Sequence, residues 1–355
     1  MSLSTGSVTG RCLRGEDDLR ERHILAGQSP IVIGLNAVIV AVTRESPRIL
    51  TIGATPDRAA EAGATAVTTQ FDVLPYGPLD PSADRTLDLS IRRWVAQRTG
   101  LELGYVEQLY TFGDRDRTSR PDRSVPRIIS VAYFALVREE QPSGSSDARW
   151  RDWYTFFPWE DRRSGISPIV GERIVPALDA WARQAGDRRT KAERLERAGI
   201  AFGLRGSSWD PDRVLERYEL LYETGLVTES TRDRSFEDNG KEDGTGLGRP
   251  MDMDHRRILA TGLGRIRGKL RYRPVVFELL PRTFTLTRLQ RVVEALAGIR
   301  LHKQNFRRLV ERGGLVEGTG RMDNRTGGRP AELFRFRRDV LRERRAPGVG
   351  LPGTR

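Results

Sequence analysis

The spacing of hydrophobic and polar residues predicts a mixed α+β arrangement in the first 140 residues. Apolar runs at residues 30–42 and 48–53, separated by the turn-forming sequence TRESP, predict two neighbouring strands. A helix is predicted next, because apolar residues recur there every four positions: Leu87, Ile91 and Val95. Asp84 suits the N-cap of this helix and Gly100 its C-terminal stop. The runs LGYVEQLYTFGD and PRIISVAYFALV predict two further strands.

The middle of the chain is predicted to be helical. Linker-like sequences at 141–147 and 237–250 flank it, and three tryptophans stand at its beginning: Trp150, Trp153 and Trp159. Aromatic clusters bury large areas, so we expect them in a core rather than in a ligand site. Asp210 and Pro211 are typical of an N-cap followed by a first helical residue. Another amphipathic helix is predicted over residues 251–270.

The last ordered unit, residues 283–340, has the pattern of a winged helix. TLTRLQRVVEALAG predicts a helix, a short turn follows, and HKQNFRRLVERGG predicts a second helix with Phe306, Leu309 and Val310 facing inward. LVEG and AELFRFR predict two strands around the Gly-rich tip TGRMDNRTGGRP.

Positive charge is concentrated in this unit. It holds 13 Lys and Arg against 6 Asp and Glu, so it carries +7 of the chain's net +12. We expect the second helix to enter the major groove of DNA and the wing to contact phosphates or the minor groove. The predicted DNA-binding residues are Thr287, Lys303, Gln304, Asn305, Arg307, Arg308, Arg321, Arg325 and Arg329. The alternative is a winged helix that contacts proteins and has an incidental basic face.

Composition limits the remaining chemistry. At 355 residues, with 37% hydrophobic and 30% charged residues, the chain suits two or three soluble domains. No apolar run is long enough to cross a bilayer, and no signal pattern opens the chain, so a cytoplasmic location is expected. The single cysteine, Cys12, excludes internal disulfides. The three histidines are far apart, which argues against a zinc site or a catalytic triad: His23, His255 and His302.

The segment GPLDPSADRTLDLSIRRWVAQRTGL resembles a degraded Nudix box, the metal-binding helix of Nudix hydrolases. Alignment on Gly100 and Leu101 places non-acidic residues at the four glutamate positions of the pattern: Arg85, Trp94, Gln97 and Arg98. Magnesium requires hard oxygen ligands, so we predict no metal and no catalysis. Asp84 and Asp88 are an alternative metal pair, although helix capping and compensation of the helix dipole are favoured for them.

The loop after the third predicted strand offers groups that suit a nucleotide. Arginines bind phosphate oxygens, an Asp accepts from a ribose hydroxyl, and Phe112 or Tyr110 is placed to stack on adenine. The predicted ligand-binding residues are Phe112, Gly113, Asp114, Arg115, Arg117 and Arg127. Chemistry alone favours the alternative, a solvated charged loop.

These features together resemble one family, the Nudix-related transcriptional regulators of NAD metabolism. The resemblance is carried by YVEQLYTFGDRDR, DHRRILATGLGRIRGKLRYRPVVFELLP and FTLTRLQRVVEAL with the helix and hairpin after it. It covers residues 30–140 and 249–340. It implies a dimeric repressor without a cofactor, which senses ADP-ribose or a related nucleotide and controls genes of NAD synthesis or salvage.

The expected fold is a Nudix-like α/β/α sandwich with a helical insertion and a C-terminal winged helix. The expected divisions are a disordered N-terminus (1–28), a Nudix-like domain (29–140), a helical insertion (141–248), a closing helix and connector (249–281), a winged helix (282–340) and a disordered basic tail (341–355). Two other functions are alternatives: an active Nudix-type hydrolase with an accessory nucleic-acid-binding domain, and a non-enzymatic nucleotide-binding adaptor.

Overall fold

The structure is a computed structural model. It describes residues 31–43, 45–53, 71–114, 127–138, 147–238, 246–324 and 330–343. The expected disordered N-terminus and most of the basic tail lie outside these residues. None of the helices among the described residues is long and apolar enough to span a membrane.

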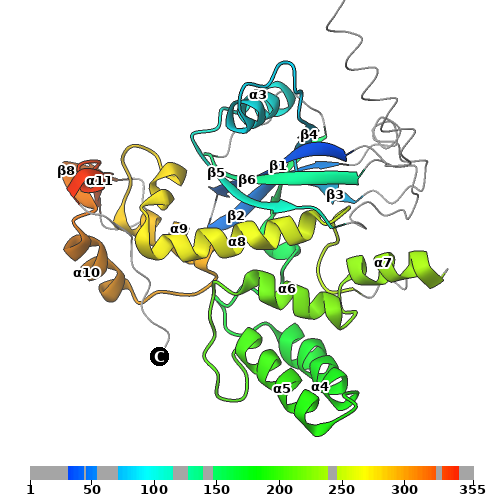
Figure 1. The fold of residues 1–355 in the computed structure, drawn as a ribbon. Helices are drawn as coiled ribbons and strands as arrows, with labels where there is room; N and C mark the ends of the chain where they lie inside the picture. The colour runs from blue at the N-terminus through cyan, green and yellow to red at the C-terminus, as the bar shows by residue number, and fades with distance from the viewer. Residues whose placement is uncertain are drawn as a thin grey trace, which may run out of the picture.

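A mixed sheet forms the centre of the molecule (Figure 1). Its strands are β1 (Ile31–Thr43), β2 (Ser46–Gly53), β3 (Asp72–Val73), β4 (Tyr76–Pro78), β5 (Tyr105–Phe112), β6 (Arg127–Leu136) and β7 (Ala148–Asp152). The order is β3-β2-β1-β6-β5, with β4 paired to β1 and β7 paired to β2. β1 and β6 are parallel, whereas the other pairs are antiparallel. The four strands predicted before residue 140 are therefore confirmed.

Strand β7 corrects the expected start of the helical insertion. Residues 148–152 pair antiparallel with β2, from Arg48 opposite Asp152 to Ile52 opposite Ala148. Trp150 thus lies in the sheet, while Trp153 and Trp159 follow it and are fully buried. The predicted core role of the latter two is confirmed. The sequence ARWRD was mistaken for part of the insertion because alternating charged residues also suit an exposed helix.

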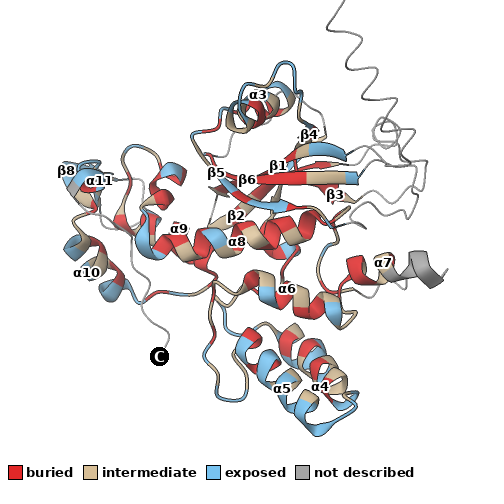
Figure 2. Cartoon of the chain, in the orientation of Figure 1, coloured by how far each residue is buried: buried red, intermediate tan, exposed pale blue. Residues whose placement is uncertain are grey.

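One helix covers each face of the sheet (Figure 1). On one face lies α3 (Leu87–Thr99), whose Ile91 and Val95 are fully buried. Its N-cap is Thr86, not Asp84 as predicted: the Thr86 hydroxyl accepts from the backbone N–H of Leu89 (3.2 Å). On the other face lies α8 (His255–Tyr272), which begins four residues later than predicted and buries its apolar side, as the red stretches in Figure 2 show.

The helical module lies on the α8 side of the sheet. It contains the π-helical turn η2 (Val170–Ile174), α4 (Val175–Arg183), α5 (Arg188–Phe202), α6 (Val214–Glu223) and α7 (Thr228–Asp238), after the 3-10 turn η1 (Trp153–Thr155). The prediction that Asp210 begins a helix is wrong, because α6 starts at Val214. The Asp210 side chain instead accepts from the Asp212 N–H (3.0 Å) in the preceding turn.

The C-terminal unit has the predicted winged-helix order. It consists of the 3-10 turn η3 (Val275–Leu279), α9 (Leu286–Ala297), α10 (Lys303–Gly313), the hairpin β8 (Val316–Asp323) and β9 (Ala331–Phe336), and a final turn α11 (Val340–Glu343). Phe277 stacks on Phe336 with 4.3 Å between ring centroids, so η3 packs with this unit. The unit therefore begins before residue 282, where the sequence was divided.

Candidate functional sites

The turn between α9 and α10 is held by a buried carboxylate. Glu294 Oε1 accepts from the backbone N–H of Leu301 and from Gln290 Nε2, both at 2.9 Å, and Oε2 accepts from Arg300 Nη1 at 2.8 Å. Burial raises the pKa of Glu294, but these hydrogen bonds and the Arg300 charge outweigh it, so the pKa is lowered. Glu294 is not among the residues predicted from the sequence, although a Glu inside an otherwise apolar helix face was a signal.

The N-terminal half of α10 presents polar side chains to solvent. Phe306 and Val310 are fully buried, which fixes the face that the helix turns outward. Four of the predicted DNA-binding residues in the first turns of α10 are exposed: Lys303, Gln304, Asn305 and Arg308. Arg307 is partly exposed. Thr287 is partly exposed in the first turn of α9. These positions suit the reading helix of a helix-turn-helix, whose N-terminal residues meet base edges.

The wing is the two-stranded hairpin β8–β9. Phe284 exchanges both backbone hydrogen bonds with Phe334 of β9 (3.0 and 2.8 Å), which adds an isolated bridge at the edge of the hairpin. Arg321 is exposed on β8. Arg335, which the predictions omitted, pairs with Glu317 across the hairpin (2.6 Å). The predicted contacts Arg325 and Arg329 lie outside the described residues.

Trp94 covers the face of α3 on which the resemblance to a Nudix box predicts the carboxylate positions. Its indole lies on Gly77 of β4, where an added Cβ would stand 2.0 Å from the Trp94 Nε1. Arg98 lies near the Trp94 ring (5.5 Å), and Gln97 and Arg85 are exposed. The glycine is therefore required by the close approach of the indole.

The two aspartates considered as a metal pair have protein partners. Asp84 accepts from Ser90 Oγ (2.6 Å) and the Asp80 N–H (2.9 Å), and it pairs with Arg93. The Ser90 and Asp80 hydrogen bonds lower the pKa of Asp84. Asp88 pairs with Arg92 (2.9 Å). Both carboxylates thus stabilise the start of α3.

Magnesium, which the Nudix fold implies, does not fit this face. The side chains supply an indole, a neutral amide and a guanidinium, whereas magnesium requires oxygen ligands. Within the described ranges, no group of three or more His, Cys, Asp or Glu side chains is placed to hold a metal ion. No chemical step through a metal is therefore assigned to these residues.

The end of β5 presents one accessible aromatic ring. Phe112 is only 8% exposed and belongs to the core, so its predicted role in stacking on adenine does not suit its position. Tyr110 is 65% exposed and meets Phe112 edge to face at 5.5 Å. Arg127 donates to the Gly113 carbonyl (2.7 Å), and Asp114 is exposed. Arg115 and Arg117 lie outside the described residues.

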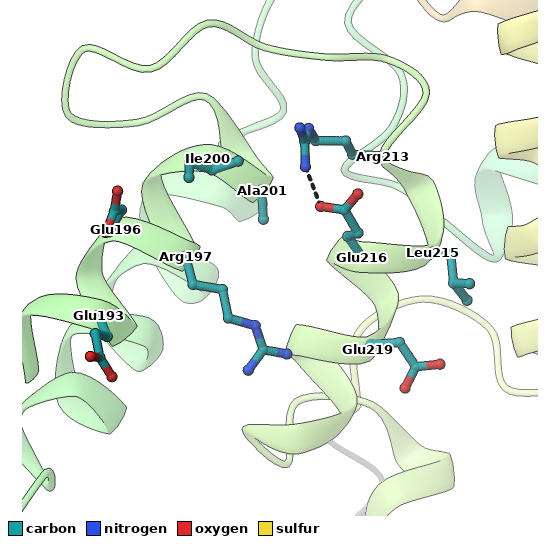
Figure 3. Close-up of a pocket in the computed structure, with 9 residues that line it drawn as sticks. All are labelled: Glu193, Glu196, Arg197, Ile200, Ala201, Arg213, Leu215, Glu216 and Glu219. Atoms are coloured by element: carbon teal, nitrogen blue, oxygen red, sulfur yellow. Dashed lines mark hydrogen bonds and ion pairs between the residues drawn. The ribbon is translucent and has the colours of Figure 1, made fainter. Parts of the chain in front are cut away.

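A hollow of about 460 Å³ lies between α5 and α6. Figure 3 shows its lining, with Arg213 directed to Glu216. Three of its four acidic side chains have arginine partners within the protein: Glu193 with Arg189, Glu216 with Arg213, and Glu219 with Arg257. Most of the negative charge of the hollow is therefore already neutralised within the protein.

The mixed sheet between α3 and α8, followed by the winged helix with the exposed start of α10, defines a class of protein: a Nudix-type α/β domain joined to a C-terminal DNA-binding winged helix. Residues 276–336 match the family of the NrtR DNA-binding winged helix domain. The solved structure of Shewanella oneidensis NrtR in complex with a 27mer DNA is similar, with a TM-score of 0.51 and 20% identity, and the match covers 87% of this chain and 95% of that one. The same protein without DNA gives a TM-score of 0.50 at 20% identity, with the same coverage.

A curated relative supports the assignment at the level of sequence. The ADPR responsive transcriptional repressor NtrR of Acinetobacter baylyi is 40% identical over 86 residues, which is 24% of this chain and 34% of that protein. The aligned part therefore spans about a third of the relative's length. Over the aligned 86 residues the chain is similar to the NtrR repressor, and its fold resembles that of NrtR.

Proposed function

We propose that this protein is a transcriptional repressor that binds operator DNA through α10 and the wing. The main support is that the exposed, polar start of α10 lies on a winged helix of the NrtR DNA-binding type. A charge of +7 in residues 283–340 supplies attraction to phosphates. Such a protein acts in the cytoplasm, where the chromosome lies, and NAD metabolism genes are the proposed targets.

We propose further that the Nudix-like domain senses ADP-ribose or a related nucleotide. The relative from A. baylyi is described as responsive to ADPR, which supports this choice of ligand. Tyr110 offers an exposed ring, and Arg127 and Asp114 lie at the same end of the sheet. The fit of these groups to adenine, phosphate and ribose is the chemical basis of the proposal.

The proposed domain is a sensor and not a hydrolase. Trp94 fills the surface above Gly77, and Arg98 beside it repels a cation. An active hydrolase needs magnesium for charge stabilisation and for water activation. The adaptor alternative differs from the repressor in one property, which is specific binding to DNA.

A gel-shift experiment tests the proposal. The purified full chain is titrated against DNA from upstream of its own gene, with and without ADP-ribose, and against a scrambled duplex of equal length. A specific shift that changes with ADP-ribose supports the repressor. Equal affinity for the two duplexes contradicts it and favours the adaptor.

A further inference from the structure

The C-terminal end of α9 is held by groups from outside the winged helix. The last carbonyls of a helix have no partners within it. Here Ala295 O accepts from the Tyr154 hydroxyl (2.7 Å), and Leu296 O accepts from Arg267 Nε (3.0 Å). The Gly298 carbonyl accepts from the backbone N–H of Arg162 (2.7 Å). Two of these three donors belong to the segment after β7 that includes the helical module.

A buried carboxylate fixes the position of these donors. Glu160 pairs with Arg217 of α6 (2.5 Å) and with Arg267 of α8, and the side chains of all three residues are 0% exposed. Arg217 also donates to the carbonyls of Ala201 (3.0 Å) and Asp210 (2.8 Å). Because Arg267 also donates from Nε to the Leu296 carbonyl, helices α6, α8 and α9 meet at one charge network.

The contact between this network and the end of α9 leaves no space. Gly298 has a φ of +71°, and a Cβ there would lie 2.4 Å from Glu160 O and 2.8 Å from the Tyr154 hydroxyl. Both the backbone conformation and the close approach therefore require glycine. This fit indicates a defined docked position for α9.

A second contact between the sheet and α9 is more exposed. Glu45, in the β1–β2 turn, pairs with Arg291 of α9 (2.7 Å), and both side chains are about half exposed. Arg163 donates to the Glu45 carbonyl (2.6 Å). Exposed ion pairs contribute little, so this pair adds less to the attachment than the buried network does.

We propose that the inserted segment is a bracket that sets the orientation of the winged helix relative to the Nudix-like domain. The bracket consists of Tyr154, Glu160 and Arg217 of this segment, which act on α9 together with their partner Arg267 of α8. They are positioning residues for DNA recognition, since all of them are buried and none lies on the exposed face of α10. A fixed orientation matters most when two winged helices must reach two half-sites at one spacing. That consequence rests on the proposed function.

Hydrogen exchange on the full chain tests the bracket without DNA. Tyr154→Phe removes only the hydroxyl that holds Ala295, and peptides covering 286–298 should exchange about two- to tenfold faster, as for one lost buried hydrogen bond. Tyr222→Phe is the matched control, because that hydroxyl binds Asp233 (2.7 Å) within the helical module. Its α9 peptides should exchange as in the parent chain. Unchanged α9 exchange in Tyr154→Phe overturns the bracket.

DNA affinity separates positioning from general damage. The Tyr154→Phe chain should bind a full operator several-fold more weakly, while its affinity for a fragment with a single half-site stays equal to that of the parent. Equal losses on both fragments, or no loss on either, overturn the positioning role. If the parent chain binds no DNA, the proposed function fails, and the exchange result alone then supports or overturns the bracket.

Discussion

Replacing Glu160 with glutamine removes the carboxylate that pairs with both Arg217 and Arg267 while keeping the shape of the side chain. Breaking a buried ion pair by deleting one partner costs about 3 to 5 kcal/mol, because a desolvated charge is left uncompensated. Glu160 pairs with two arginines, but we expect the free energy of unfolding to fall by this amount once and not twice. Arg217 retains carbonyl partners at Ala201 and Asp210, and the glutamine oxygen still accepts one hydrogen bond.

Thermal unfolding measures this loss. The entropy of unfolding is about 2.1 cal/mol/K per residue, so for 355 residues that unfold together a loss of about 3 to 5 kcal/mol lowers Tm by roughly 4 to 7 °C. Glu193→Gln is the control, because its pair with Arg189 is highly exposed and contributes at most about 1 kcal/mol.

The pH dependence gives a second signature. Burial raises the pKa of Glu160, but the charges and hydrogen bonds of Arg217 and Arg267 outweigh it, so the folded-state pKa is below the ordinary 4.5. Such a carboxylate contributes its full stability above the unfolded pKa and loses it as pH falls through the folded value. The Tm difference between the parent chain and Glu160→Gln should therefore persist at pH 7 and shrink below about pH 4.5. At pH 7 the Tm of Glu160→Gln should lie clearly below that of the Glu193→Gln control. Tm values of the two variants within about 1 °C of each other would refute the reasoning.

Three other predictions follow from the sites. In competition gel shifts, Lys303→Ala and Arg307→Ala should each reduce the discrimination between base sequences by about 1 to 3 kcal/mol. Arg321→Ala should weaken binding to all DNA sequences alike and reduce the slope of affinity against salt concentration by about one unit. Equal losses of affinity for specific and random DNA in the helix variants would show that α10 does not read the base sequence. The purified chain should not hydrolyse ADP-ribose with magnesium, since Trp94 supplies no ligand, and steady product release above a heat-inactivated control would contradict this. In sedimentation the chain should be a dimer on an inverted-repeat operator, with an affinity that ADP-ribose changes; a monomer on DNA, or one affinity with and without nucleotide, would contradict it.

Local patterns were sufficient to predict most individual elements. The apolar runs at 30–42 and 48–53 and the four-residue spacing of Leu87, Ile91 and Val95 indicate which residues each element buries, and these are patterns of neighbouring residues. The winged helix was predictable for the same reason, since its two helices, Gly stops and hairpin are consecutive in sequence. The match of residues 276–336 to the NrtR DNA-binding winged helix domain confirms this prediction.

Boundaries were less predictable where several polar residues competed for one role. Asp84 and Thr86 are both suitable N-caps, and only the hydrogen bond to the Leu89 N–H selects Thr86. Asp210 lies in a turn before α6 for the same kind of reason. The strand β7 depends on its partner β2, because short charged strands are stabilised by pairing more than by propensity.

The sequence by itself determined the kinds of domain, the non-acidic residues at the predicted Nudix-box positions and the concentration of charge at the C-terminus. Only the tertiary structure decided how these parts are joined. In the sequence, Arg217 lies 57 residues and Arg267 107 residues after Glu160, and no local pattern links the three. Their pairing depends on burial, because guanidinium and carboxylate groups that leave water must find each other in the folded chain. The same reason explains why Gly298 appeared in the sequence as an ordinary helix stop and in the structure as the contact between two domains.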